Sequence, residues 1–104
     1  MRSTALSRAG VPIRLTDERW LHIIAGHAEL SLMRNDVLRT IAAADRIVPG
    51  ADGARMAIRA MDSRKALVVV YRELTMHDGF VITTFVTKRL AAFDRRPDLW
   101  PPKN

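Results

Sequence analysis

The chain has 104 residues, which matches the commonest size of a single protein domain. Hydrophobic residues make up 48% of it and charged residues 27%, a balance that suits a packed core and argues against global disorder. No apolar run approaches the ~20 residues of a membrane-spanning helix, and cysteine is absent. We therefore expect a cytoplasmic protein without membrane association, disulfides or a thiolate metal site.

Basic residues outnumber acidic residues by 17 to 11, which gives a net charge of +6. Only Lys65, Lys88 and Lys103 of these basic residues are lysines, and the others are arginines. Arginine binds phosphate groups through two parallel hydrogen bonds, so the bias favours a polyanionic partner such as RNA. A base-composition bias of the genome explains the same arginine content equally well.

The first fifteen residues carry little pattern. Residues 1–10 are small and basic without hydrophobic periodicity, and they predict a flexible basic tail. Residues 11–15 alternate loosely, which fits a short edge strand or an extended lead-in. A central strand is disfavoured there because Pro12 lacks a backbone N–H group.

Two helices follow. Thr16 is a good N-cap, two acidic residues suit the first turn, and Gly26 ends the predicted first helix. A second helix is expected to begin with Asn35 or Asp36 as its cap and to end near residue 44, with its apolar side chains at helical spacing.

From residue 46 the hydrophobic period changes to two. Strands are predicted near residues 46–48, 54–61, 66–74 and 80–87. The third of these is apolar on both faces, which places it centrally. We expect an α+β fold in which the two N-terminal helices pack on one face of an antiparallel sheet of about four strands. One domain would span residues 11–93, and residues 94–104 would form a Pro-rich C-terminal tail.

Alternation along the strands assigns side chains to the two faces of the predicted sheet. In residues 54–61 the apolar row contains Met56, Ile58 and Ala60, and we expect this row to face the helices. Arg55 and Arg59 would then lie on the open face, where they contact phosphates or are simply solvated.

In residues 80–87 the row Phe80, Ile82, Thr84 and Val86 is the expected core row. Thr83 and Phe85 would lie on the open face, where a hydroxyl can bind phosphate and an aromatic ring can stack on a base. The β-propensity of these residues explains their presence equally well.

Three histidines, His22, His27 and His77, lack the spacing of metal ligands, so we predict no metal and no cofactor. His22 and His27 are five residues apart and would not share a face of a continuous helix. Because Gly26 is expected to end the helix, both imidazoles can still converge as a general acid and a general base. The alternative is a half-buried helix residue and a polar cap. His77 is expected to be an exposed turn residue.

The run Leu15–Leu30 resembles the opening W-x-H-I-x-x-x-H-P-E-L of small phage- and toxin-associated domains. These domains belong to the BECR-type nuclease superfamily, which groups barnase, EndoU, the colicin ribonucleases and RelE-like toxins. Three later segments, Asp45–Val48, Val68–Arg72 and Val81–Phe85, are similar to its sheet strands in the same order. The resemblance covers about residues 15–89. Ala28 replaces the family's Pro, and Thr84-Phe85 replaces Ala-Tyr.

This resemblance implies metal-independent cleavage of RNA by attack of the ribose 2′-OH on its own phosphate. The residues at matching positions are His22, His27, Arg72, Thr83, Phe85 and Lys88. Our first hypothesis is therefore a toxin-like or phage-type endoribonuclease. It assigns acid–base work to the two histidines, phosphate contacts to arginines and Lys88, and orientation to Thr83.

Two other hypotheses remain open. The same fold serves as a non-catalytic RNA- or protein-binding module, or as a subunit that is silent without its partner. An acidic antitoxin or immunity protein would be the natural partner of a basic toxin.

Overall fold

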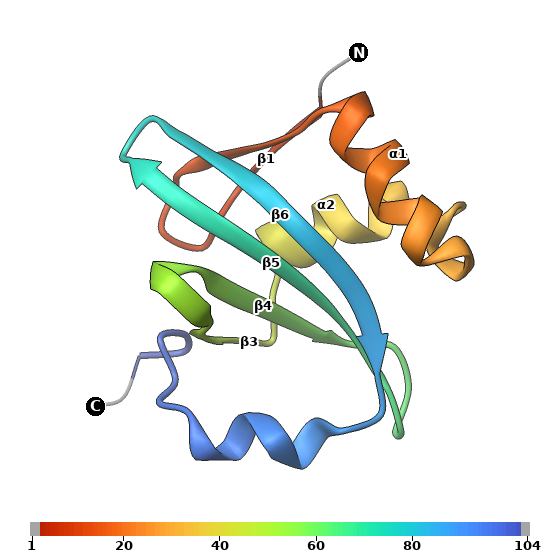
Figure 1. Cartoon of the computed structure of the whole chain (residues 1–104). Coiled ribbons are helices and arrows are strands. Elements are labelled where there is room, and N and C mark those ends of the chain that lie inside the picture. The colour runs from red at the N-terminus through yellow and green to blue at the C-terminus, as the bar shows by residue number, and fades with distance from the viewer. Residues whose placement is uncertain (1–2, 103–104) are drawn as a thin grey trace.

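The computed structural model describes residues 3–102 and shows an α+β fold built on a six-stranded mixed sheet (Figure 1). The order of the strands across the sheet is β1-β2-β6-β5-β4-β3. Every neighbouring pair is antiparallel except β2 and β6, which run parallel. The expected sheet of about four antiparallel strands is thus too small. The strands are β1 Ser3–Leu6, β2 Pro12–Leu15, β3 Arg46–Pro49, β4 Arg55–Ala60, β5 Ala66–Thr75 and β6 Asp78–Thr87.

The N-terminal segment supplies both additional strands. Within the predicted flexible tail, Ser3–Leu6 forms β1 and pairs with β2, while residues 1 and 2 lie outside the described part of the chain. β1 occupies the edge of the sheet and β2 is internal, which corrects the expected edge position of β2. Pro12 is tolerated because it is the first residue of β2 and pairs with the last residue of β1, at the end of the ladder.

Parallel pairing of β2 with β6 depends on a glycine. The paired residues are Ile13 with Gly79 and Arg14 with Phe80. A Cβ atom on Gly79 would lie 2.5 Å from the Arg72 carbonyl oxygen and 2.5 Å from Cδ1 of Ile13. Both distances are shorter than any ordinary contact between heavy atoms. Only glycine therefore lets β2 approach β6 at this register.

The first helix agrees closely with its prediction. α1 spans Asp17–Gly26, and the Thr16 hydroxyl accepts a hydrogen bond of 3.0 Å from the Arg19 N–H. A short 3₁₀ turn, η1 (Ala28–Leu30), links it to α2 (Arg34–Ala42). Met33, rather than Asn35 or Asp36, occupies the N-cap position of α2 and makes no side-chain capping bond.

Both helices pack against one face of the sheet. Trp20 and Ile23 from α1 and Val37 and Ile41 from α2 are buried in one apolar cluster. The sheet contributes side chains from five strands, β2 to β6, to this cluster. They are Ile13, Leu15, Ile47, Ala57, Leu67, Val69, Tyr71 and Val81. This apolar cluster therefore holds α1 and α2 against the sheet.

The opposite face is partly covered by the 3₁₀ segment η3 (Leu90–Arg95), which runs below the sheet in Figure 1. Phe93 of η3 is buried against Val48, Ile58, Ala66 and Val68. The predicted facing of β4 is therefore inverted. Its apolar row, which includes Met56 and Ile58, packs towards η3, whereas Arg55, Ala57 and Arg59 face the helices.

A β-bulge changes the facing within β6. Val70 pairs with Thr83 and the next residue, Tyr71, pairs with Val81, so Ile82 is an extra residue in β6. Thr84 is buried and Val86 packs against the helix-side core, in agreement with the predicted row. Before the bulge, Val81 takes the core position that the alternation assigned to Phe80.

The C-terminal residues are held against the sheet edge. Arg46 forms ion pairs of 2.8 Å with Asp94 and 2.6 Å with Asp98. The backbone of Trp100 forms a β-bridge with Ile47. The predicted tail is thus attached to β3 at least as far as Trp100, and residues 103 and 104 lie outside the described part. Among residues 3–102 no helix has the length and apolarity needed to cross a membrane.

The close approach at Gly79 generates a stability prediction. Gly79→Ala forces β2 away from β6 and should lower the free energy of unfolding by about 1–3 kcal/mol, the usual cost of overpacking. Chemical denaturation measures this change. Gly26→Ala is the matched control, because a Cβ atom there meets no heavy atom within 4 Å. Equal stability of the two variants would contradict the proposed role of Gly79.

Candidate functional site

A surface hollow of about 640 Å³ lies between the start of α1 and the neighbouring ends of β2 and β6. Its walls combine two guanidinium groups, one carboxylate, one imidazole and one aromatic ring. The residues that line it are Arg14, Thr16, Glu18, Arg19, His22, Phe80 and Val81. We call it the His22 hollow.

The first turns of α1 bring three charged or titratable groups to this hollow. Glu18 and His22 are four residues apart and Arg19 and His22 are three apart, so all three side chains lie on the same side of the helix. Glu18, Arg19 and His22 are all exposed to solvent. The Thr16 cap holds the first turn in register, and the hollow therefore has a defined helical wall.

Strands β2 and β6 form the other wall. Arg14 alternates with the buried Ile13 and Leu15 and therefore points away from the helix-side core. Its guanidinium binds Asp78 through two hydrogen bonds, Nε–Oδ1 of 2.9 Å and Nη2–Oδ2 of 3.0 Å. These bonds raise the pKa of Arg14 above its ordinary value. The Arg14 Cζ atom also lies 5.7 Å from the centre of the Phe80 ring.

This arrangement is suited to the chemistry of phosphate esters. Imidazole and carboxylate groups serve as general acids and bases in enzymes, and guanidinium groups stabilise negative charge on phosphate oxygens. A half-exposed aromatic ring offers a surface on which a nucleobase can stack. Among residues 3–102 no cluster of three or more His, Asp or Glu side chains is arranged to hold a metal ion.

Of the predicted site residues, only His22 lines the hollow. His27 follows α1 as its C-cap, and its Nδ1 atom lies 3.6 Å from Oε1 of Glu29. The hollow that contains His22 is lined on α1 by Glu18 and Arg19, without His27. The expected convergence of two imidazoles on one site is therefore not seen.

Four more of the predicted residues lie on or near the face that η3 partly covers. Arg72 donates a hydrogen bond to the Asp52 carbonyl oxygen, and Thr83 pairs with Val70 in the sheet. Phe85 packs against the apolar cluster beneath η3, so its ring is part of that second core. Lys88 is exposed just beyond β6.

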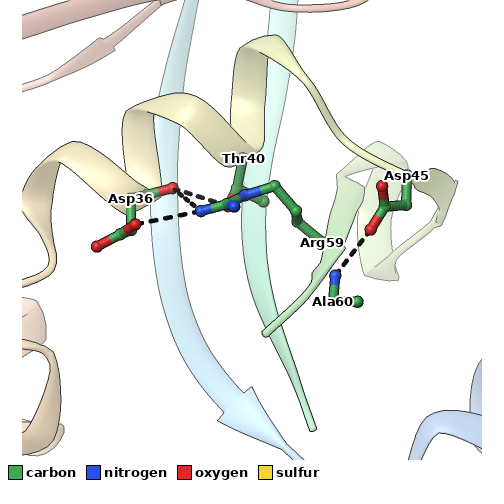
Figure 2. A network of polar contacts seen from close by, with 5 residues as sticks. All are labelled: Asp36, Thr40, Asp45, Arg59 and Ala60. Carbon is green, nitrogen blue, oxygen red and sulfur yellow. Dashed lines mark hydrogen bonds and ion pairs between the residues drawn. The ribbon is translucent and has the colours of Figure 1, made fainter. Parts of the chain in front are cut away.

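Arg55 and Arg59 face the helices, where both have protein partners. Figure 2 shows the Arg59 guanidinium directed at α2, with Nε 3.1 Å from the Thr40 hydroxyl and Nη2 3.3 Å from Oδ1 of Asp36. Arg55 Nε lies 3.1 Å from Oε1 of Glu73. The predicted open-face position of these two arginines is thus wrong, because α2 occupies that face.

The sequence prediction missed Arg14, Glu18, Arg19 and Phe80. A usable signal existed on α1, since the spacing of Glu18 and His22 predicts a shared helix face. Phe80 carried no such signal, because the bulge at Ile82 changes which face it occupies. Arg14 reaches the hollow only because β2 is inserted beside β6.

Comparisons of the chain with protein-family models, with curated proteins and with solved structures find no match.

The contacts of Arg59 predict a structural role for this side chain. Arg59→Ala removes the hydrogen bonds to Thr40 and Asp36 and should destabilise the protein by about 1–3 kcal/mol, the range for hydrogen bonds that involve a charged group. Thermal or chemical unfolding measures the effect. Arg39→Ala, at an exposed position of α2, removes the same charge and should change stability little. A stability loss as large for Arg39→Ala would contradict this role.

Proposed function

We propose that this protein is a metal-independent endoribonuclease that cleaves RNA in the His22 hollow. The observation that carries the proposal is the presence of His22, Glu18 and two arginines around one hollow that also contains the Phe80 ring. The net charge of +6 supports a polyanionic substrate. The resemblance of residues 15–89 to BECR-type nucleases supports the same reaction class.

In the proposed reaction the ribose 2′-OH attacks the adjacent phosphorus atom. The Glu18 carboxylate accepts the proton of the 2′-OH, and the His22 imidazolium donates a proton to the departing 5′-oxygen. One P–O bond forms and another breaks, which leaves a 2′,3′-cyclic phosphate and a free 5′-OH.

The arginines stabilise the negative charge that develops on the phosphate oxygens. A guanidinium has five N–H donors, and the bonds to Asp78 use two of those of Arg14. Asp78 therefore orients the Arg14 guanidinium, and the remaining N–H donors of Arg14 point away from the Asp78 carboxylate. Phe80 provides a stacking surface for the base next to the cleaved bond.

Residues outside the hollow have lesser roles in this proposal. His27 is a helix cap that pairs with Glu29. Exposed cations such as Lys88 contribute general attraction to RNA rather than chemistry. The positive charge also suits an acidic antitoxin or immunity protein as a partner in the cytoplasm, and such a protein would compete with RNA.

The proposed roles predict a distinct pattern of activity. His22→Ala and Glu18→Gln should each lower the rate of RNA cleavage by about 10²–10⁴, the usual contribution of a general acid or base. The measurement is cleavage of total RNA in the presence of EDTA, followed by mapping of the new ends. Cleaved ends should carry 2′,3′-cyclic phosphates.

His27→Ala is the matched control, because it removes an imidazole that lies just beyond the end of α1 and does not line the hollow. It should retain most of the activity. Undiminished cleavage by the double variant of Glu18 and His22 would contradict the proposed site. Intact RNA with strongly salt-dependent binding would instead identify a non-catalytic RNA-binding module.

A further inference from the structure

A second, smaller cavity lies on the helix-side face, at the edge formed by the C-terminal segment. Its volume is about 100 Å³. Backbone hydrogen bonds from Leu99 and Trp100 to the Ile47 carbonyl oxygen, of 2.7 and 3.3 Å, hold its outer wall against β3. The residues that line the cavity are Arg8, Ala9, Ile47, Arg55, Tyr71, Glu73, Leu99 and Trp100. None of them lines the His22 hollow.

Tyr71 is the most unusual member of this lining. Its side chain is fully buried, with 0% exposure, yet its hydroxyl has no hydrogen-bond partner among the described residues. A buried hydroxyl without a partner costs about 1–3 kcal/mol relative to one with a partner. Buried polar groups in folded proteins nearly always have a partner, so this hydroxyl is available to donate a hydrogen bond to a ligand in the cavity.

The charges around Tyr71 favour an anion. Arg55 Nε binds Oε1 of Glu73 at 3.1 Å, and the Ser7 hydroxyl donates to Oε2 of Glu73 at 2.6 Å. Both oxygens of the Glu73 carboxylate therefore already have a partner within the protein. Arg8 adds a second guanidinium, whose Cζ lies 4.8 Å from the centre of the Trp100 ring. Two guanidinium groups against one carboxylate leave the lining with a net positive charge.

We infer that this cavity binds a compact oxyanion of the phosphate class, whose oxygen accepts a hydrogen bond from the Tyr71 hydroxyl and whose charge is balanced by Arg55 and Arg8. The small volume admits one such group and excludes a nucleoside. The Arg55 side chain is 38% exposed and marks the side from which the anion enters. The oxyanion is a free ion or the terminal phosphate of a nucleic acid.

Binding is tested by NMR on the ¹⁵N-labelled protein. The chain contains two tryptophans, and Trp20→Phe assigns the indole N–H signal of Trp100. Inorganic phosphate is added at constant ionic strength to about 20 mM, far above the Kd of about 1 mM expected for so small a ligand. The Trp100 indole and Arg55 Nε–H signals should shift along a saturable curve.

Variants distinguish phosphate binding in this cavity from general attraction of phosphate to a basic surface. Tyr71→Phe should weaken phosphate binding about tenfold, and Arg55→Gln by at least as much. Arg39→Gln removes the same charge from an exposed position of α2 and should leave the affinity unchanged. Equal weakening by Arg39→Gln would overturn the inference.

A second ligand distinguishes the two sources of the anion. If phosphate alone shifts Trp100, the ligand is a free ion. If only an oligoribonucleotide with a 5′-phosphate does so, and its unphosphorylated twin does not, the ligand is a nucleic-acid end. Absence of a saturable shift with either ligand would overturn the inference, and it would leave the proposed ribonuclease activity of the His22 hollow untouched.

The same residue generates a pH prediction. Burial, followed by the negative charge of Glu73, raises the pKa of Tyr71 to about 12. The folded state therefore holds this proton more tightly than the unfolded state, and stability should fall between pH about 10 and pH about 12. Tyr71 is the only tyrosine, so its absorbance at alkaline pH follows this residue alone. A phenol that titrates near its ordinary pKa in the folded protein would contradict the described burial.

Removal of the hydroxyl provides a complementary measurement. In phosphate-free buffer near neutral pH, Tyr71→Phe should leave the protein as stable as the parent or more stable, because it deletes a buried polar group that has no partner. Chemical denaturation measures this difference. A clear loss of stability would show that the hydroxyl already has a partner and would overturn the inference.

Discussion

The insertion of β2 beside β6 is the constraint on which the rest of the structure depends. It requires a residue without a side chain at Gly79, where a Cβ atom would collide with the backbone of β5 and with Ile13. Once β2 lies there, Arg14 is placed beside Phe80, and α1 must begin at the same end of the sheet. The composition of the His22 hollow follows from this one close approach between strands.

Much of the local structure is predictable from the sequence, whereas its assembly is not. Thr16 and Gly26 correctly predict both ends of α1, and period-two alternation finds β4, β5 and β6 within two residues at each end. Alternation divides the side chains of β4 into two rows but does not show which element packs on each row. The facing of β4 is mispredicted for this reason. η3 buries the apolar row, while α2 accommodates Arg59 through the polar groups of Asp36 and Thr40.

The candidate site illustrates the same limit. The spacing of the histidines identifies His22 as a candidate site residue but pairs it with His27, which lies just beyond the end of α1. The more informative spacing is the single helical turn between Glu18 and His22. Non-local placement of Arg14 and Phe80 has no signal in the local sequence, since one depends on the parallel strand pair and the other on the bulge at Ile82. Structural arginines and exposed arginines likewise look the same in the sequence. Only the contacts of each side chain in the folded protein distinguish the two kinds.

The most direct test of RNA binding in the His22 hollow locates an RNA analogue on the protein without relying on turnover. A short oligonucleotide with 2′-deoxyribose at the scissile position cannot be cleaved by 2′-OH attack and is added to the ¹⁵N-labelled protein in EDTA. We expect the largest chemical-shift changes around the His22 hollow, at Arg14, Glu18, His22 and Phe80. Changes confined to η3 and the C-terminal arginines, with the signals of α1 unmoved, would contradict this expectation.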